Sequence, residues 1–324
     1  MARTRLYRSG KLESEDFPVD DISEHIADES AVVWLDVCRP TVEDFQKIGE
    51  ELGLHALAIE DATSPHERAK LNHYQTHLFM TAYSTTFDPK SLGIFMHEVS
   101  AFITKRALIT VRMDEDFDIQ KVVDRWDGQA DLARFGVGFL LYGLLDELVD
   151  GHFDALQALD TALEEVEEVL FDEAPASIRQ VQRRSFVLRK SLGHLRKVAV
   201  PMREIVNELI RSNAKLVTED LMPYYQDVYD HVLRVGEWVE GQRDYVSTVL
   251  DTNVSVQGNR SNTVMKKVTS WAAIIAVPTA ITGFYGQNIP FPGYEHHWGF
   301  IVSSVLIAVL SVTLYVTFKR NDWL

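Results

Sequence analysis

The chain has 324 residues, of which 46% are hydrophobic and 25% are charged, and its formal net charge is −16. The negative charge argues against binding of nucleic acid through its phosphates and is compatible with a protein that handles cations. The only cysteine, Cys38, excludes a disulfide framework and is expected to be a small buried residue of the apolar run Ala31–Arg39.

Residues 1–135 combine strand and helix patterns, and they predict a cytosolic α/β domain with a mixed sheet. β-Branched and aromatic residues are frequent in Ala31–Arg39, in His77–Phe87 and in the hairpin pair Glu98–Thr104 and Ala107–Met113. Helices are predicted over Thr41–Leu54, with Thr41 as N-cap, and over His55–Ala62. These residues contain neither a glycine-rich phosphate loop nor a nucleophile elbow, so we expect no nucleotide site and no enzyme.

Residues 136–222 predict a cytosolic helical hairpin. The segment Asp146–Glu173 is acidic and has apolar residues at helical spacing, Ala174–Pro175 interrupts the helix, and a basic segment follows from Arg179 to Arg203. The polar faces of the two helices either attract each other or are separately solvated.

Residues 223–285 predict a long stalk helix that continues into a first transmembrane span at about 268–285. Pro278 is the only proline after Pro223 in this range. About 60 helical residues would extend roughly 90 Å. Because such a rod cannot bury its apolar positions alone, we expect a bundle of several copies of the chain.

Two uncharged stretches, Val268–Tyr285 and Phe300–Phe318, are long enough to cross a bilayer. Lysines precede the first stretch, and the basic tail 319–324 follows the second, whereas the connecting loop 286–299 has no basic residue. This distribution predicts a two-pass protein of the plasma or inner membrane, with both termini in the cytoplasm.

A stripe of small and weakly polar residues follows one face of the first span. Its members recur at spacings of 4, 3, 4, 4, 3 and 4: Ser261, Met265, Val268, Ala272, Ala276, Thr279 and Gly283. Periodicity allows either a seam between helices or the lining of a water-filled pore. An uncharged lumen offers no ligands to replace a hydration shell, so it would conduct a hydrated ion, and Mg²⁺ suits this arrangement.

The outer end of this stripe carries Tyr285-Gly286-Gln287-Asn288, which resembles the YGMN signature of the CorA-type divalent cation transporters. Ser261–Lys266 before the span, Trp298-Gly299 at the second span and the terminal Trp323-Leu324 are similar to the same family. The resemblance extends over nearly the whole chain. It implies that Gly286, Gln287 and Asn288 form the selectivity filter, and Gln287 stands where magnesium transporters of the family have Met.

The resemblance also implies a homopentamer with the first spans around a central pore. It further implies that Mg²⁺ bound between neighbouring cytosolic domains, at Asp88 and Asp227, keeps the channel closed, and that Asp251 attracts or coordinates an ion in the funnel. Without the resemblance, Asp88 and Asp227 are interpreted as turn or cap residues.

Residues and resemblance together predict a homopentameric channel for influx of hydrated Mg²⁺ that is gated by cytosolic Mg²⁺. Two alternatives stay open. One is a Zn²⁺ or Co²⁺/Ni²⁺ transporter on the same scaffold, and the other is a membrane-anchored metal sensor that does not conduct.

Overall fold

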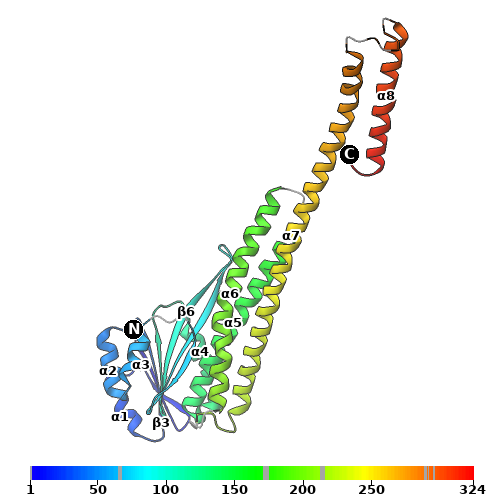
Figure 1. Ribbon diagram of the computed structural model, residues 1–324. Coiled ribbons are helices and arrows are strands. Elements are labelled where there is room, and N and C mark those ends of the chain that lie inside the picture. Colours follow the sequence, from blue (N-terminus) through cyan, green and yellow to red (C-terminus); the bar gives the residue numbers. More distant parts are fainter. Residues whose placement is uncertain are drawn as a thin grey trace. The chain divides into compact units, whose positions relative to one another are not determined.

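The structure is a computed structural model that describes residues 2–64, 68–170, 175–211, 216–287, 290, 292–294 and 296–324. It contains two compact units, Met1–Val249 and Leu250–Leu324 (Figure 1). The first unit combines a mixed β-sheet with helices, and the second contains two apolar helical segments. The predicted fold class is confirmed.

The sheet of the first unit has seven strands in the order β2-β1-β3-β7-β6-β5-β4. Only the central pair β3–β7 is parallel, and the other neighbours are antiparallel, so the sheet is mixed. The strands are β1 (Ala2–Arg8), β2 (Lys11–Glu15), β3 (Ala31–Cys38), β4 (Lys70–His73), β5 (Leu78–Asp88), β6 (Gly93–Ile103) and β7 (Ala107–Arg112).

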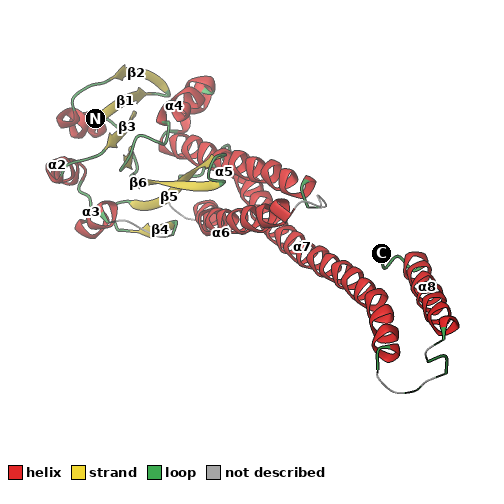
Figure 2. Cartoon of the chain, turned by 90° about the horizontal axis from the view of Figure 1, so that it is seen from above, coloured by secondary structure: helices red, strands yellow, loops and turns green. Residues whose placement is uncertain are grey.

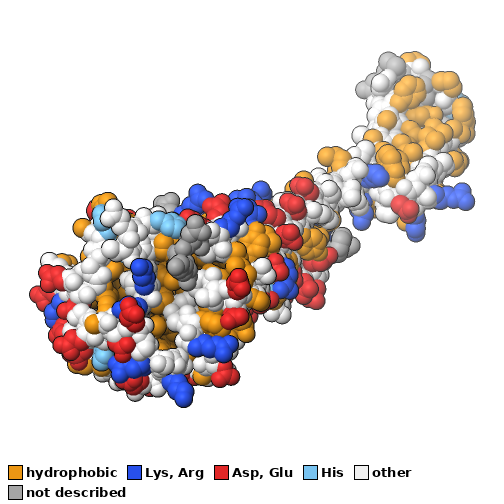
Figure 3. Space-filling model, turned by 90° about the horizontal axis from the view of Figure 1, so that it is seen from below, with side chains coloured by type: hydrophobic (Ala, Val, Ile, Leu, Met, Phe, Trp, Pro, Cys, Tyr) orange, Lys and Arg blue, Asp and Glu red, His pale blue; other side chains and the backbone are white. Residues whose placement is uncertain are grey.

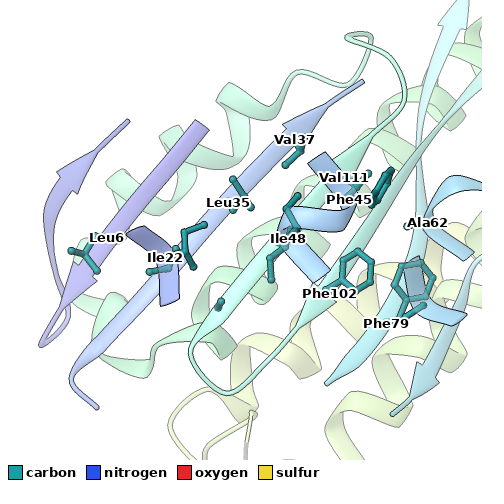
Figure 4. Packing of buried hydrophobic residues seen from close by; sticks show 14 of the residues in the cluster. Leu6, Ile22, Leu35, Val37, Phe45, Ile48, Ala62, Phe79, Phe102 and Val111 are labelled. Carbon is teal, nitrogen blue, oxygen red and sulfur yellow. The ribbon is translucent and has the colours of Figure 1, made fainter. Parts of the chain in front are cut away.

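Both faces of this sheet are covered by helices (Figures 1 and 2). The short turn η1 (Val19–Asp21) and the helices α1 (Ile22–Ala27), α2 (Val42–Leu52) and α3 (Ala56–Thr63) belong to one face, and α4 (Ile119–Gly128), η2 (Ala130–Phe135) and α5 (Val137–Glu168) to the other. On the first face, Leu35, Phe79 and Phe102 pack with Phe45 and Ile48 (Figure 4).

Residues of the opposite parity pack on the second face, because side chains alternate along a strand. Trp34, next to Leu35, contacts Trp126 of α4 edge-to-face with ring centroids 5.0 Å apart.

The N-cap that the sequence predicts for α2 is present. Thr41 accepts from the Asp44 backbone N–H, and the Asp44 carboxylate accepts from the Thr41 N–H. Cys38 is buried, as expected.

α5 packs against α6 (Pro175–Arg211) as the predicted hairpin. Buried leucines from both helices lie in this unit: Leu156, Leu159 and Leu163 from α5 with Leu188, Leu192 and Leu195 from α6. Among the described residues, Arg184 and Glu165 form the only ion pair between the two helices, with 2.6 Å between Nη2 and Oε2. Of the two alternatives, attraction between the polar faces is therefore present, but through this one ion pair. Ala174 lies outside the described residues.

α7 (Met222–Tyr285) begins in the first unit, where it packs on α5. The Tyr225 hydroxyl is fully buried and donates to the Gly138 carbonyl at 2.8 Å, while Tyr224 contacts Tyr142 through its ring. Burial raises the pKa of Tyr225, which keeps this hydroxyl a donor. The valines Val228, Val232, Val235, Val239 and Val246 form the buried side of this part of α7.

The second unit consists of the rest of α7 and of α8 (His297–Arg320), and both helices are long and apolar enough to cross a membrane. Hydrophobic side chains cover much of its visible surface (Figure 3). α8 is partly covered along one stripe only, formed by Gly299, Ser303, Ile307, Ser311, Leu314 and Phe318. The remaining faces of the two helices are exposed in a single chain.

Candidate functional site

The seven residues of the predicted stripe on α7 are all exposed in the single chain: Ser261, Met265, Val268, Ala272, Ala276, Thr279 and Gly283. The covered side of the same helix segment is formed by Lys266, Ser270, Ala273, Ile274, Val277, Pro278, Ile281 and Tyr285. At roughly 100° per residue, the mean directions of the two sets lie about 170° apart around the helix axis.

The covered side of α7 faces α8. Ser270 is fully buried, and the Lys266 ammonium lies 6.0 Å from the ring centroid of Trp323, which follows α8. The predicted stripe therefore points away from the second span of its own chain. The seam interpretation then holds only if a second copy of the chain packs there, because α8 covers the opposite face.

The turn after α7 carries the first two residues of the predicted filter. The Gly286 N–H donates to the Thr282 carbonyl at 2.9 Å, and the Gln287 N–H donates to the Phe284 carbonyl at 3.3 Å. A Cβ at position 286 would lie 3.0 Å from the Thr282 oxygen, so this turn leaves little room for a side chain. Gly286 and Gln287 are exposed, and Asn288 lies outside the described residues.

Asp88 is the last residue of β5, and its carboxylate organises the following turn. It accepts hydrogen bonds from the Ser91 hydroxyl at 2.6 Å and from the backbone N–H groups of Lys90 and Ser91 at 3.0 and 3.2 Å. These hydrogen bonds, led by that of the Ser91 hydroxyl, hold the pKa of Asp88 below its usual value. The carboxylate thus stays ionised and partly exposed at the end of the β5–β6 hairpin.

Asp227 lies near the beginning of α7, with its side chain exposed. Its Oδ2 is 3.6 Å from Nδ1 of His231, one helical turn later. The His231 ring also forms a group with Asp146 and Asp150 of α5, in which the ligand atoms lie within 4.8 Å of one another. The sequence analysis did not predict this group, although Asp227 and His231 stand at positions i and i+4 of a predicted helix.

Arg125 of α4 carries the positive charge that balances these acids. Its guanidinium donates to Asp146, to Glu147 at 2.8 Å and to Asp150 at 2.7 Å. The Asp146 side chain is nearly buried, and this burial raises its pKa although Arg125 acts in the opposite direction. Three carboxylates share one guanidinium here, so the surface between α5 and the start of α7 remains negative.

Asp251 belongs to the second unit and is exposed on α7. Its backbone carbonyl accepts from the Ser255 hydroxyl at 3.1 Å. At roughly 100° per residue, its direction differs by about 60° from the mean direction of the stripe that starts at Ser261. Asp251 is therefore the acid that precedes the stripe on nearly the same side of the helix.

Comparison with known proteins gives one consistent result. The family described as "CorA-like Mg2+ transporter protein" matches residues 29–320. The cobalt/magnesium transport protein CorA of Thermotoga maritima is 30% identical over 307 residues, covering 92% of this chain and 85% of that protein. The zinc transport protein ZntB of Yersinia pseudotuberculosis is 22% identical over 227 residues, covering 70% of this chain and 68% of that protein.

Solved structures agree with this result at the level of the fold. The complete structure of the CorA magnesium transporter from Methanocaldococcus jannaschii has a TM-score of 0.80 at 21% identity, and the match covers 100% of this chain and 99% of that chain. The full-length CmaX protein has a TM-score of 0.68 at 19% identity, with 99% and 97% covered.

Proposed function

The chain belongs to the CorA-like Mg²⁺ transporter family of divalent cation transporters, and from this we propose that it is a homopentameric channel that admits hydrated Mg²⁺ into the cytoplasm. The observation that carries the proposal is the stripe from Ser261 to Gly283, which is small, uncharged, exposed and directed away from α8. A ring of such faces from several copies encloses a lumen. The number five follows from the family resemblance.

Conduction through this lumen needs no chemical step. An uncharged lining offers hydrogen bonds to the water around an ion but does not replace its inner hydration shell, which Mg²⁺ releases reluctantly. For an ion with two charges, the membrane potential contributes about 4.6 kcal/mol per 100 mV of inward driving force. Gly286, Gln287 and Asn288 form the outer entrance, with both termini of the chain in the cytoplasm.

Gating is assigned to carboxylates of the cytosolic domains. Asp88 of one copy and Asp227 of its neighbour would repel each other in the absence of a cation, and Mg²⁺ between them relieves that repulsion. The position of Asp88 at the end of the β5–β6 hairpin supports this role, because its partly exposed carboxylate is within reach of a neighbouring copy. When cytosolic Mg²⁺ falls, the site empties and the population shifts toward an open bundle. Asp251 attracts ions at the inner end of the stripe.

The relatives support a second candidate, a Zn²⁺ or Co²⁺/Ni²⁺ transporter on the same scaffold. A zinc transport protein and cobalt/magnesium transport proteins both match this chain. Gln287 weakens the assignment to Mg²⁺, because it stands where magnesium transporters of the family have methionine and brings an amide oxygen and an N–H₂ donor to the entrance. A non-conducting metal sensor is the third candidate. Competitive uptake of Mg²⁺, Zn²⁺, Co²⁺ and Ni²⁺ ranks these possibilities.

The decisive experiment is ion influx into liposomes that contain the purified protein and a Mg²⁺-sensitive dye. We expect influx under an inside-negative potential, loss of influx in Ala276→Leu, which narrows the lumen, and altered influx in Asn288→Ala. Ala308→Leu is the matched control, because Ala308 is exposed on α8 outside its covered stripe. Absence of influx with the parent chain contradicts the channel, and equal effects of the two Ala→Leu variants contradict the pore-lining role of the stripe.

Gating is tested separately by limited proteolysis. We expect Mg²⁺ to protect the parent chain from trypsin and to protect Asp227→Lys and Asp88→Lys less. Unchanged protection in both variants would place the regulatory site elsewhere. A monomeric or dimeric particle in detergent would rule out the pentamer.

A further inference from the structure

A second group of metal-ligating side chains lies within the α/β domain, apart from the residues assigned to conduction and gating. His97 of β6 meets Asp114 and Asp116 of the segment that follows β7. Each residue offers one ligand atom, and the three atoms lie within 4.8 Å of one another. All three residues come from the same chain, so the group is complete without assembly.

Hydrogen bonds to Thr86, from Cys38 and within the Asp114–Asp116 turn orient the members of the group. Nε2 of His97 lies 3.2 Å from the Thr86 hydroxyl on β5, which leaves Nδ1 for the two carboxylates. Oδ1 of Asp114 accepts from the Asp116 backbone N–H at 3.0 Å, and the Asp114 carbonyl accepts from the Cys38 thiol at 3.1 Å. Metal-binding histidines are held in this way, with the second ring nitrogen on an outer hydrogen-bond partner.

The two distances from the imidazole to the carboxylates are close to those between ligand atoms of a tetrahedral ion. His97 Nδ1 is 3.2 Å from Asp114 Oδ2 and 3.4 Å from Asp116 Oδ2. Ligand atoms about 2.0–2.1 Å from a tetrahedral Zn²⁺ lie roughly 3.3–3.4 Å apart. Around an octahedral Mg²⁺ with similar bond lengths, adjacent ligand atoms lie about 2.9 Å apart. Imidazole also suits zinc and other transition metals, whereas Mg²⁺ prefers oxygen ligands.

The two histidine–aspartate groups of the domain differ in whether a basic side chain neutralises their carboxylates. Asp146 and Asp150, beside His231, already accept hydrogen bonds from Arg125. In the described part of the chain, no lysine or arginine forms an ion pair with Asp114 or Asp116. The neighbouring Arg112 donates to Asp36 and to the Phe117 carbonyl, and it acts on Asp114 only through longer-range electrostatics.

The two carboxylates therefore have only the imidazole as a partner within ion-pair distance among the described residues. A neutral imidazole whose Nε2–H donates to Thr86 turns a lone pair toward them. A metal cation would relieve the repulsion among these three electron-rich atoms. A proton on Nδ1 would compete with the metal for the same position.

We propose that His97, Asp114 and Asp116 bind a transition-metal dication of the Zn²⁺ class, with water in the fourth position. The ion would fasten the segment after β7 to the β5–β6 hairpin. Thr86 lies two residues before Asp88 on the same strand. The site thus gives the cytosolic domain a binding place for a metal other than Mg²⁺, connected through Thr86 to the strand that ends at the carboxylate proposed for gating. The site itself does not depend on the channel proposal.

The test is calorimetric titration of the full-length protein in detergent with Zn²⁺, in buffer that contains millimolar Mg²⁺ to occupy oxygen-only sites. We expect one Zn²⁺ per chain in the parent and in His231→Gln, which alters the other histidine–aspartate group. We expect affinity to fall by at least about tenfold in His97→Gln and in Asp116→Asn, and by about tenfold in Thr86→Val, which removes the outer partner.

Asp116 keeps the test informative if a change at His97 disturbs folding, because its side chain is 68% exposed. Titration with Co²⁺ adds an optical readout, since a tetrahedral site with imidazole gives visible absorption that the same variants should lose. Absence of Zn²⁺ binding by the parent in the presence of Mg²⁺ would overturn the proposal. Equal Zn²⁺ affinity of the parent, His97→Gln and Asp116→Asn would overturn it as well, because the group would then be only an imidazolium–carboxylate ion pair.

Discussion

Replacement of Arg125 by methionine tests the charge balance of the acidic surface between α4 and α5. Methionine fills a similar volume but removes the guanidinium that donates to Asp146, Glu147 and Asp150. The side chains of Asp146 and Glu147 are only 9% and 13% exposed, and that of Asp150 is 48% exposed. The substitution therefore leaves two nearly buried carboxylates and one half-exposed carboxylate without their cation.

The expected loss of stability follows from this burial. Removal of one partner from a buried ion pair costs about 3–5 kcal/mol, because the remaining charge is left without compensation. For a domain of this size, each 1 kcal/mol lowers the melting temperature by roughly 2–4 °C. The first unit should then melt roughly 6–20 °C lower in Arg125→Met than in the parent. Millimolar Mg²⁺ should recover part of the loss, since a dication can take the place of the guanidinium.

Thermal melting of the full-length protein in detergent, followed by far-ultraviolet circular dichroism with and without Mg²⁺, measures both effects. Arg184→Met is the matched control. It removes the ion pair with Glu165, whose side chain is 58% exposed, and should change stability by no more than about 1 kcal/mol. Equal melting temperatures of the parent and Arg125→Met would refute the reasoning, and so would equal shifts in the two variants.

Three further predictions concern the stability of the first unit. Burial lowers the pKa of His152 to about 4, below the unfolded value near 6.5. The stability that the neutral imidazole contributes is therefore complete above pH 6.5 and is lost as the pH falls toward 4. Thermal melting against pH should show a loss of about 3 kcal/mol in the parent and a smaller loss in His152→Gln. Thr41→Ala removes a cap and should cost about 1 kcal/mol in chemical denaturation, whereas Thr41→Ser should be close to neutral. Arg112→Met leaves Asp36 buried without its cation and should cost about 3–5 kcal/mol, a loss that Arg112→Met combined with Asp36→Leu should reduce.

The elements predicted from the sequence were those whose apolar pattern is uninterrupted. β3, β5 and the β6–β7 hairpin consist largely of β-branched and aromatic residues, and α2 has a complete capping box. The two spans were visible because a bilayer demands a long run without charge. In each of these segments, the local preference and the tertiary environment agree.

The strands β1 and β2 were missed because a buried arginine hides the alternation. Arg5 is only 4% exposed, although the pattern of Ala2–Arg8 reads as a polar segment. Its guanidinium is satisfied by Glu15 of β2 and by Asp127 of α4, which is 122 residues away in sequence. No local sequence pattern could predict the pairing of Arg5 with Asp127. α4 was also missed, although Asp118 caps it and Val122, Val123 and Trp126 form its apolar face.

The candidate sites, like the helices and strands, differed in whether a local sequence pattern predicts them. A stripe on one helix follows from spacing alone, and the structure locates it on the uncovered side of α7. Groups drawn from several elements do not follow from spacing. Asp146 and Asp150 meet His231 only because α5 packs on α7, and His97 meets Asp114 because the segment after β7 continues alongside β6 in the register that pairs Val99 with Arg112. Chain topology, not local sequence, brings these ligands together.

The distribution of acids along α7 connects the conduction and sensing roles proposed above. Between Asp251 and Tyr285 the chain contains no aspartate or glutamate, whereas Asp227 and its neighbours on α5 form a dense acidic surface. A site that senses an ion must hold it long enough to shift a population, and carboxylates supply that affinity. A lumen that conducts must release each ion quickly, and strong ligands would trap it. One continuous helix therefore carries carboxylates where binding is needed and omits them where passage is needed, so a carboxylate introduced into the stripe, as in Thr279→Asp, should increase ion occupancy and reduce the rate of influx.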